Sequence, residues 1–159
     1  MKIRYRILVL GIILTVTAGV MCMRFLFGVV TVNGRSMEPL LHHGDNLVYQ
    51  KGWLKPKRGD VIVFEREGEY YIKRVYGVPG DKVEITEGGM VLVNQIPLEN
   101  KNLLIKGKTE PCDMTGEVTL GQDEYFVLGD HRTISRDSRC REAGNVRKKE
   151  VVGIFCFKK

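Results

Sequence analysis

An uncharged apolar run near the start of the chain constrains its fold more than any other feature. From Ile7 to Met23 the sequence carries no charged residue, and three cations lie within the six residues before it. At about 1.5 Å per residue, a helix over this run covers most of a bilayer core of roughly 30 Å. The apolar stretch resumes after Arg24, whose long side chain can reach the membrane interface. We therefore expect residues 1–28 to form a short cytoplasmic tip and a transmembrane anchor.

The same run could instead belong to a cleaved signal peptide. Such a peptide has a shorter apolar core that ends in small residues at a cleavage site. No such cleavage site follows Met23 before the sequence takes on the pattern of a folded domain. We therefore expect an uncleaved, single-pass anchor in the cell membrane. Because cations crowd its N-terminal flank, the positive-inside rule places the N-terminus in the cytoplasm and residues 29–159 outside it.

Composition limits the chain beyond the anchor to one domain. The chain has 159 residues, of which 43% are hydrophobic and 28% charged, which argues against a polytopic membrane protein and against disorder. The formal net charge is +6, and residues 147–149 form its only tight cluster of cations. We therefore expect the lipid bilayer, and not nucleic acid, to be the partner of this basic excess.

Short runs rich in β-branched and aromatic residues predict that residues 29–159 form a mostly β domain. Gly-, Pro- and Asp-containing turns separate these runs, and two of the breaks are short enough for hairpins. We expect antiparallel strands in a closed or nearly closed, barrel-like arrangement, with Asn100–Gly121 as a surface excursion. The predicted strands are Asn46–Lys51, Val61–Arg66, Tyr70–Val78, Lys82–Thr86, Met90–Gln95, Glu124–Leu128 and Val151–Phe157.

The cysteines permit one disulfide at most outside the anchor. Cys22 lies in the apolar run, which leaves Cys112, Cys140 and Cys156, and the sequence does not say which of these pair. No C-x-x-C pair occurs, so we expect no structural zinc site. We expect no metal and no cofactor.

Two polar residues stand out for their chemistry. Ser36 lies between Gly34 and Pro39 directly after the anchor, where an ordinary turn residue is the simpler interpretation. Lys73 lies within an apolar, aromatic-rich strand, where it could simply reach solvent. A lysine that is buried enough can lose its proton and act as a general base, and a Ser–Lys pair needs neither histidine nor aspartate.

A conventional Ser/His/Asp triad is a weak hypothesis here, because His42 and His43 are adjacent and His131 is expected in a loop.

The order of four segments resembles the type I signal peptidases, which are membrane-anchored Ser/Lys proteases. After the anchor come Ser36-Met37-Glu38-Pro39, then Gly59-Asp60-Val61-Ile62-Val63-Phe64, then Lys73-Arg74-Val75 with Gly77-x-Pro79-Gly80-Asp81, and last Gly129-Asp130 with Ser135-x-Asp137-Ser138-Arg139. Each segment is weak alone, but the ordered set covers nearly the whole chain. The short spacing between Ser36 and Lys73 is similar to the compact, Gram-positive-like branch.

The resemblance implies a role for individual residues. Ser36 would be the nucleophile and Lys73 the general base. Ser135 would orient the lysine. Asp137 and Arg139 would support that loop, and Arg74 would pair with Asp137.

The resemblance also implies an oxyanion site and a substrate pocket. Gly34 stands two residues before the nucleophile, where it can offer only backbone donation to the oxyanion. Met37, Pro39 and Tyr71 are expected at shallow apolar pockets for small side chains. Leu40 and His131 depart from the family pattern, which has Thr and Asn there, and neither position belongs to the dyad.

The resemblance implies a serine endopeptidase that removes signal peptides from translocated preproteins, close to the translocation machinery. Its substrate would bind as an added strand with small residues at the cleavage site. Two alternatives stay open. One is a catalytically silent or specialised relative that acts in pilin or surface-protein assembly. The other is a self-cleaving repressor with the same dyad, disfavoured because such chains carry a DNA-binding helical domain.

Overall fold

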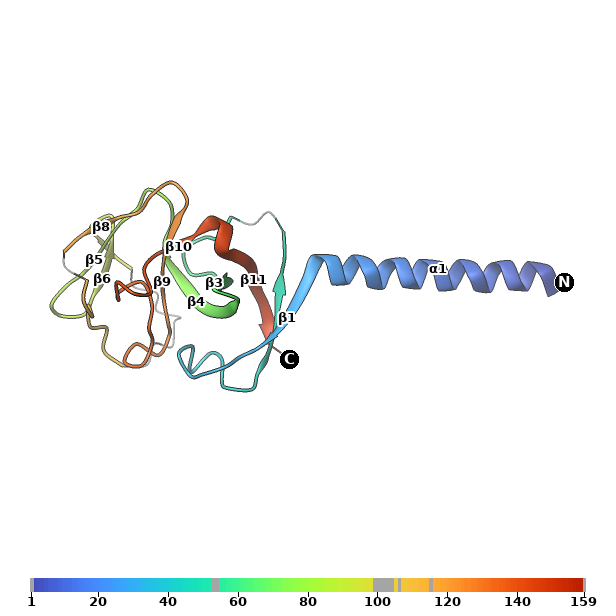
Figure 1. The fold of residues 1–159 in the computed structure, drawn as a ribbon, viewed down its shortest axis with the longest axis horizontal. Coiled ribbons are helices and arrows are strands. Elements are labelled where there is room, and N and C mark those ends of the chain that lie inside the picture. Colours follow the sequence, from blue (N-terminus) through green and yellow to red (C-terminus); the bar gives the residue numbers. More distant parts are fainter. Residues whose placement is uncertain (1, 53–54, 99–104, 106, 115, 159) are drawn as a thin grey trace.

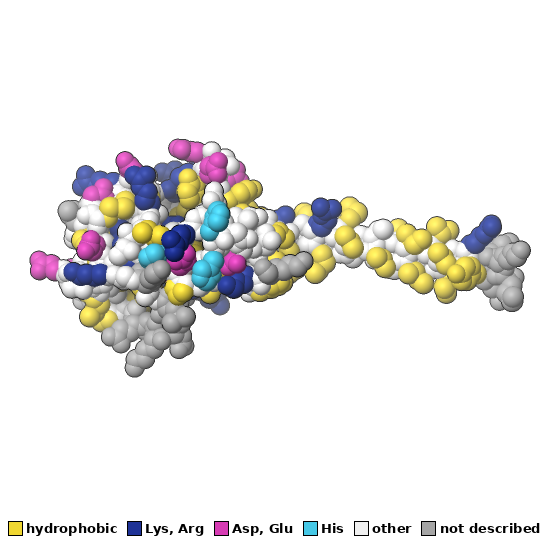
Figure 2. Space-filling model, turned by 90° about the horizontal axis from the view of Figure 1, so that it is seen from below, with side chains coloured by type: hydrophobic (Ala, Val, Ile, Leu, Met, Phe, Trp, Pro, Cys, Tyr) yellow, Lys and Arg dark blue, Asp and Glu magenta, His cyan; other side chains and the backbone are white. Residues whose placement is uncertain are grey.

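One long helix, α1 (Lys2–Leu26), leads from the N-terminus into a β domain (Figure 1). Its segment Tyr5–Leu26 has 22 residues and a mean hydropathy of 2.2, so it is long and apolar enough to cross a membrane. Apolar side chains cover the helix, whereas charged side chains gather on the domain (Figure 2). The computed structural model describes residues 2–52, 55–98, 105, 107–114 and 116–158.

The larger of two antiparallel sheets has seven strands in the order β1-β2-β11-β3-β4-β9-β10. The chain enters this sheet directly from α1, and the last long strand, β11, is inserted between β2 and β3. The 3-10 turn η1 precedes β11. The elements are β1 (Phe27–Thr31), β2 (Asn46–Gln50), β3 (Val61–Arg66), β4 (Glu69–Gly77), β9 (Glu124–Leu128), β10 (Val146–Arg147), η1 (Lys148–Glu150) and β11 (Val151–Lys158).

A second sheet of four short strands, in the order β7-β6-β5-β8, forms the end of the domain away from α1 (Figure 1). It packs a separate apolar cluster against the larger sheet through Tyr76, Phe126 and Leu128. Its elements are β5 (Lys82–Ile85), β6 (Val91–Val93), β7 (Ile96–Pro97) and β8 (Val118–Thr119).

The mostly β domain after a single N-terminal helix is confirmed. All seven predicted strands are present within one or two residues of their expected bounds. Within the described residues neither sheet closes into a barrel, because β1 and β10 are edges of the larger one. Part of Asn100–Gly121 lies outside the described residues. The rest is not wholly a surface segment, since Thr109 and Leu120 are buried.

Helix α1 ends at Leu26, and strand β1 begins with the next residue. Phe27 and Gly28 already pair with β2. The physical reason lies in the ring of Tyr49, which packs so close to Gly28 and Gly153 that a Cβ atom on either glycine would collide with it. The absence of two side chains thus lets a buried tyrosine fix β1 and β11 against β2.

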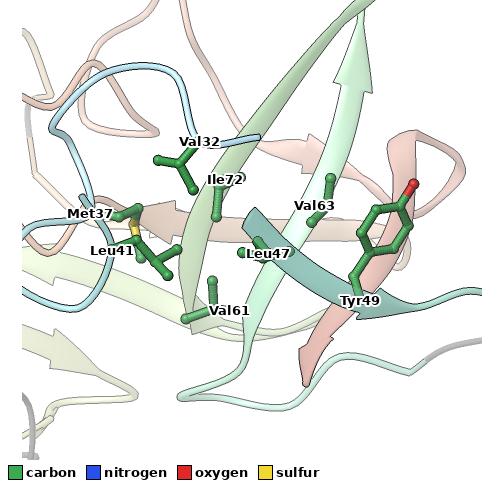
Figure 3. Packing of buried hydrophobic residues seen from close by; sticks show 8 residues of the cluster. All are labelled: Val32, Met37, Leu41, Leu47, Tyr49, Val61, Val63 and Ile72. Atoms are coloured by element: carbon green, nitrogen blue, oxygen red, sulfur yellow. The ribbon is translucent and has the colours of Figure 1, made fainter. Parts of the chain in front are cut away.

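The core beneath the larger sheet includes the segment that carries Ser36. Met37 and Leu41 project from the loop after β1 onto the side chains of Leu47, Val61 and Ile72 (Figure 3). Met37 is 2% exposed and Leu41 fully buried. Burying two large side chains on one short loop stabilises its position by several kcal/mol, at about 25 cal/mol per Å² of apolar surface.

The one disulfide in the described part of the chain joins Cys112 to Cys140. Cys156 is a free, exposed thiol. The bond links the segment before β8 to the loop that follows β9, across a sequence separation of 28 residues.

Replacing both Cys112 and Cys140 by serine is expected to lower the free energy of unfolding by about 2–4 kcal/mol, because the unfolded chain regains the entropy of an open loop of this length. Thermal or denaturant unfolding in detergent, followed by circular dichroism, measures the change. Cys156→Ser is the matched control and should unfold like the parent. Equal stability of the double variant and the parent would contradict the pairing.

Candidate active site

Ser36, from the loop after β1, meets Lys73, from strand β4. Ser36 follows β1 in a turn whose neighbour Met37 is anchored in the core, and Lys73 lies in the middle of β4. The Lys73 Nζ donates a hydrogen bond of 2.7 Å to the Ser36 Oγ. Lys73 is only 6% exposed, whereas Ser36 is partly open to solvent. The amine therefore reaches the hydroxyl from the interior of the domain.

Burial changes the chemistry of this lysine. It lowers the pKa of Lys73 from 10.5 to about 8, and the Asp137 and Asp130 carboxylates oppose this shift while Arg139 adds to it. Desolvation dominates because a charged ammonium loses its hydration inside the domain. A usable fraction of Lys73 is thus neutral near neutral pH and can accept a proton from the hydroxyl that it contacts.

Arg74 pairs with Asp130, so the expected pairing of Arg74 with Asp137 is wrong. The guanidinium forms a two-pronged contact with Asp130, at 2.8 Å from Nε and 2.6 Å from Nη2. Its remaining Nη1 donates to the Gly59 carbonyl at 2.8 Å. The reason is strand register: Arg74 lies opposite Leu128 at the end of β9, which brings Asp130 within reach. Through these contacts Arg74 links three of the four sequence segments.

Asp137 is bound by Arg139 instead. Arg139 Nε lies 2.7 Å from Asp137 Oδ1, and both side chains are almost fully buried. Asp137 Oδ2 also accepts the main-chain N–H of Gly129 at 3.0 Å. Arg139 donates further to the carbonyls of Arg132 and Ser135. The pair therefore ties together the first part of the loop after β9.

Gly129 brings this loop against Ser36. A Cβ atom on Gly129 would collide with the Ser135 Oγ and the Ser36 carbonyl oxygen. That carbonyl also accepts the N–H of His131 at 2.9 Å. Ser135 is buried beside the dyad, and its hydroxyl has no hydrogen-bond partner within the described residues. The expected contact between Ser135 and Lys73 is thus not formed here, although the two side chains belong to one site.

Gly34 adopts a positive φ of 102°, a conformation that glycine adopts without strain. Its N–H donates to His43 Nδ1 at 3.2 Å. The backbone donor expected to face the oxyanion is therefore already occupied. The main-chain N–H of Ser36 has no partner within the described residues and remains the available donor.

A groove of about 60 Å³ runs past the dyad. Residues 30–33 form one wall and residues 70–73 the other, with Ser36 and Met37 at its end. Two of the three predicted pocket residues, Met37 and Tyr71, line this groove. Pro39 is half-buried beyond it and is not part of its lining.

Sequence reasoning missed the roles of three residues near the dyad. Asp130 and Gly129 are visible as a Gly-Asp pair, but nothing in the sequence indicates that Asp130 takes Arg74. His43 is a poor candidate for a base, yet it accepts a hydrogen bond from Gly34 in the loop that carries Ser36. The spacing between Gly34 and His43 matches no sequence motif that would have indicated this contact.

Lys73→Met should raise the free energy of unfolding at pH 7, by about 1–3 kcal/mol, because it removes the cost of a buried ammonium while keeping the apolar stem. Between about pH 8 and 10.5 the unfolded chain binds more protons at this site than the folded one, so the parent gains stability as the pH rises. The advantage of the variant should therefore shrink over that window. Thermal unfolding of both proteins from pH 7 to 10.5 measures it, and a constant difference would contradict the burial cost.

Comparison with known proteins identifies the family of this chain. A family described as "Signal peptidase, peptidase S26" matches residues 4–158. The chain is 35% identical over 156 residues to signal peptidase I of Bacillus amyloliquefaciens, covering 92% of this chain and 83% of that one. It is 31% identical over 154 residues to signal peptidase IB of Staphylococcus aureus strain Mu50, with 85% and 78% covered.

A solved structure is also similar. The crystal structure of a signal peptidase I from Enterococcus faecalis V583 superimposes with a TM-score of 0.52 at 30% sequence identity, over 66% of this chain and all of that one. The family match spans both the apolar helix and the β domain that holds the Ser36–Lys73 contact. The chain therefore belongs to the signal peptidase family, peptidase S26.

Proposed function

We propose that this protein is a membrane-anchored serine endopeptidase that removes signal peptides from preproteins, with Ser36 as nucleophile and Lys73 as general base. The observation that carries the proposal is the 2.7 Å hydrogen bond between the Lys73 amine and the Ser36 hydroxyl. Relatives named signal peptidase I support the reaction class. The assignment of the two roles is our own.

Acylation begins when the Ser36 oxygen attacks the scissile carbonyl and Lys73 takes the hydroxyl proton. The Ser36 N–H donates to the oxyanion that forms, since the Gly34 N–H is engaged by His43. Lys73 then gives its proton to the departing amine, which frees the mature protein. In the second half of the reaction the neutral amine activates a water molecule that hydrolyses the acyl-enzyme.

The neighbouring ion pairs keep Lys73 available for this cycle. Asp130 is bound by Arg74 and Asp137 by Arg139, so neither carboxylate forms an ion pair with the lysine within the described residues. A direct salt bridge would stabilise the ammonium and raise its pKa. Arg74, Asp137 and Arg139 are thus positioning residues in this proposal, together with Ser135.

The anchor places this chemistry at the membrane surface. We propose that α1 crosses the cell membrane with its N-terminus in the cytoplasm and that the β domain lies outside, near the translocation machinery. The few residues between β1 and Ser36 keep the nucleophile close to the bilayer. A signal peptide whose apolar core lies in the same bilayer would present its extended cleavage segment to the groove. The small groove favours small side chains there.

The second candidate is a silent or specialised relative in pilin or surface-protein assembly. A silent relative requires no contact between Ser36 and Lys73, so the hydrogen bond between them disfavours it.

Ser36→Ala and Lys73→Ala should each reduce cleavage of a model preprotein in membranes by at least about 1,000-fold, because each removes one member of the dyad. The measurement is the rate of appearance of the mature protein, with circular dichroism to establish that each variant is folded. Normal cleavage by Lys73→Ala would refute the general-base assignment. A folded parent that cleaves nothing would favour the silent relative.

The pH dependence of kcat/KM should have an acid limb centred at about pH 8, since only the neutral amine accepts the serine proton. Below that pH the rate should fall about tenfold per unit. Initial rates on a peptide substrate from pH 5 to 9 measure the profile. A rate that stays flat down to pH 6 would contradict the proposal.

A further inference from the structure

The Cys112–Cys140 disulfide is attached to the loop after β9 at the point where that loop supports the dyad. Cys140 directly follows Arg139, whose guanidinium neutralises Asp137. The Cys140 N–H donates to the Asp137 carbonyl at 2.9 Å, and the Cys140 carbonyl accepts the N–H of Gly144 at 2.9 Å. The bond therefore holds the turn that carries the Asp137–Arg139 ion pair.

The other end of the bond lies in the segment 107–114, which braces this turn at three neighbouring points. The Glu110 carbonyl accepts a hydrogen bond of 3.1 Å from Arg139 Nη1. The Asp113 carboxylate accepts the N–H of Arg141, at 2.8 Å and 3.1 Å from its two oxygens. The disulfide lies between these two contacts along the chain and joins the two segments covalently. No residue of this described segment belongs to a helix or strand, so these contacts fix its position against the turn.

The bond is open to solvent. Cys112 is exposed, and Cys140 is half-buried at the wall of a cavity of about 290 Å³ that also reaches Asp137 and Lys73. Exposed disulfides are the ones that dithiols reduce most readily. We propose that the Cys112–Cys140 bond is a redox switch that sets the activity of the Ser36–Lys73 dyad. The inference rests on the proposed function and adds its regulation.

The switch opens by exchange with a dithiol, such as the active-site pair of a thiol–disulfide oxidoreductase. A thiolate of the reductant attacks one sulfur of the bond and forms a mixed disulfide, which the second thiol of the reductant then resolves. Two electrons and two protons pass to Cys112 and Cys140, which end as thiols, while the reductant leaves as its own disulfide. Exchange with an oxidised dithiol closes the bond again.

Opening the bond loosens the hold on Arg139. The brace then depends on the hydrogen bonds at Glu110 and Asp113, and the second of these is exposed to water. Besides burial, which lowers the pKa of Lys73, Asp137 raises this pKa and Arg139 lowers it. When Arg139 moves with the loosened turn, it no longer neutralises Asp137. Lys73 then keeps its proton to a higher pH, and a smaller fraction of it can act as a general base.

The charged groups that face Lys73 are balanced in the oxidised protein, so the loss of one pair changes that balance. Asp130 pairs with Arg74 and Asp137 with Arg139. Around the cavity, the other lining cations and carboxylates are equal in number: Arg66, Arg136, Glu67 and Glu142. Among all these groups, Asp137 is the one to which Cys140 is itself hydrogen-bonded within the described residues.

The test measures kcat/KM on a peptide substrate from pH 6 to 9.5, using the full chain in detergent before and after treatment with dithiothreitol. Reduction should move the acid limb upward by about half a pH unit or more, which lowers the rate at pH 7 about threefold, because the limb falls about tenfold per unit. Labelling of two additional thiols establishes that the bond is open, and circular dichroism that the chain is folded. Removal of dithiothreitol and reoxidation should restore the parental profile.

Two variants complete the experiment. The double variant Cys112→Ser with Cys140→Ser should have the profile of the reduced protein whether or not dithiothreitol is present. Cys156→Ser is the matched control, because Cys156 is a free thiol, and it should respond to dithiothreitol like the parent.

The outcomes separate this inference from the proposed function. The switch is refuted if reduction leaves the profile unchanged, or if it lowers the rate by the same factor at every pH, as a merely structural bond would. It is also refuted if the bond resists dithiothreitol, or if the reduced chain unfolds at the assay temperature. In each of these cases the oxidised parent still cleaves and the peptidase stands. If the oxidised parent leaves every peptide intact, the proposed function fails and the switch with it.

Discussion

The burial of one amine is the constraint on which the rest of this site depends. Lys73 must lie deep enough to lose hydration, yet it must touch a hydroxyl that is open to substrate. A nearby free carboxylate would defeat this arrangement, because it would hold the proton on the lysine. Asp130 and Asp137 both lie close enough to affect the pKa of Lys73, and both are neutralised by an arginine of their own. Each carboxylate is thus kept from pairing with the lysine by an ion pair that does not include the lysine.

Those ion pairs also hold the site together. Arg74 joins β4 to the end of β9 and to the Gly59 carbonyl, while Arg139 closes the loop after β9 onto itself. The disulfide at Cys140 ties the same loop to the segment before β8. Gly129 supplies the close approach that lets this loop reach the Ser36 carbonyl. Buried ion pairs of this kind contribute less to net stability than to the choice of a single arrangement, which is what a two-residue catalytic contact requires.

The same strand that buries the lysine offers its free edge to a peptide. Strand β4 is covered by β9 only beyond Arg74, so its first half borders both the small groove and the larger cavity. A strand has two faces with different surroundings, and an extended substrate must present alternate side chains to them. One backbone arrangement can therefore select the substrate side chain strictly at one position and tolerate many side chains at the next.

The sequence by itself determined the apolar helix and the seven principal strands, and it displays the four ordered segments on which the prediction of Ser36 and Lys73 rests. These features depend on local composition and spacing, which a single chain displays directly. Only the tertiary structure decided that Arg74 takes Asp130, that Cys112 pairs with Cys140, that His43 occupies the Gly34 N–H, and that Phe27 already belongs to a strand. Each of these depends on strand register or loop packing between residues that lie from 9 to 56 positions apart. The local sequence pattern does not indicate this register, because several residues of the same chemical type could pair with each of these groups.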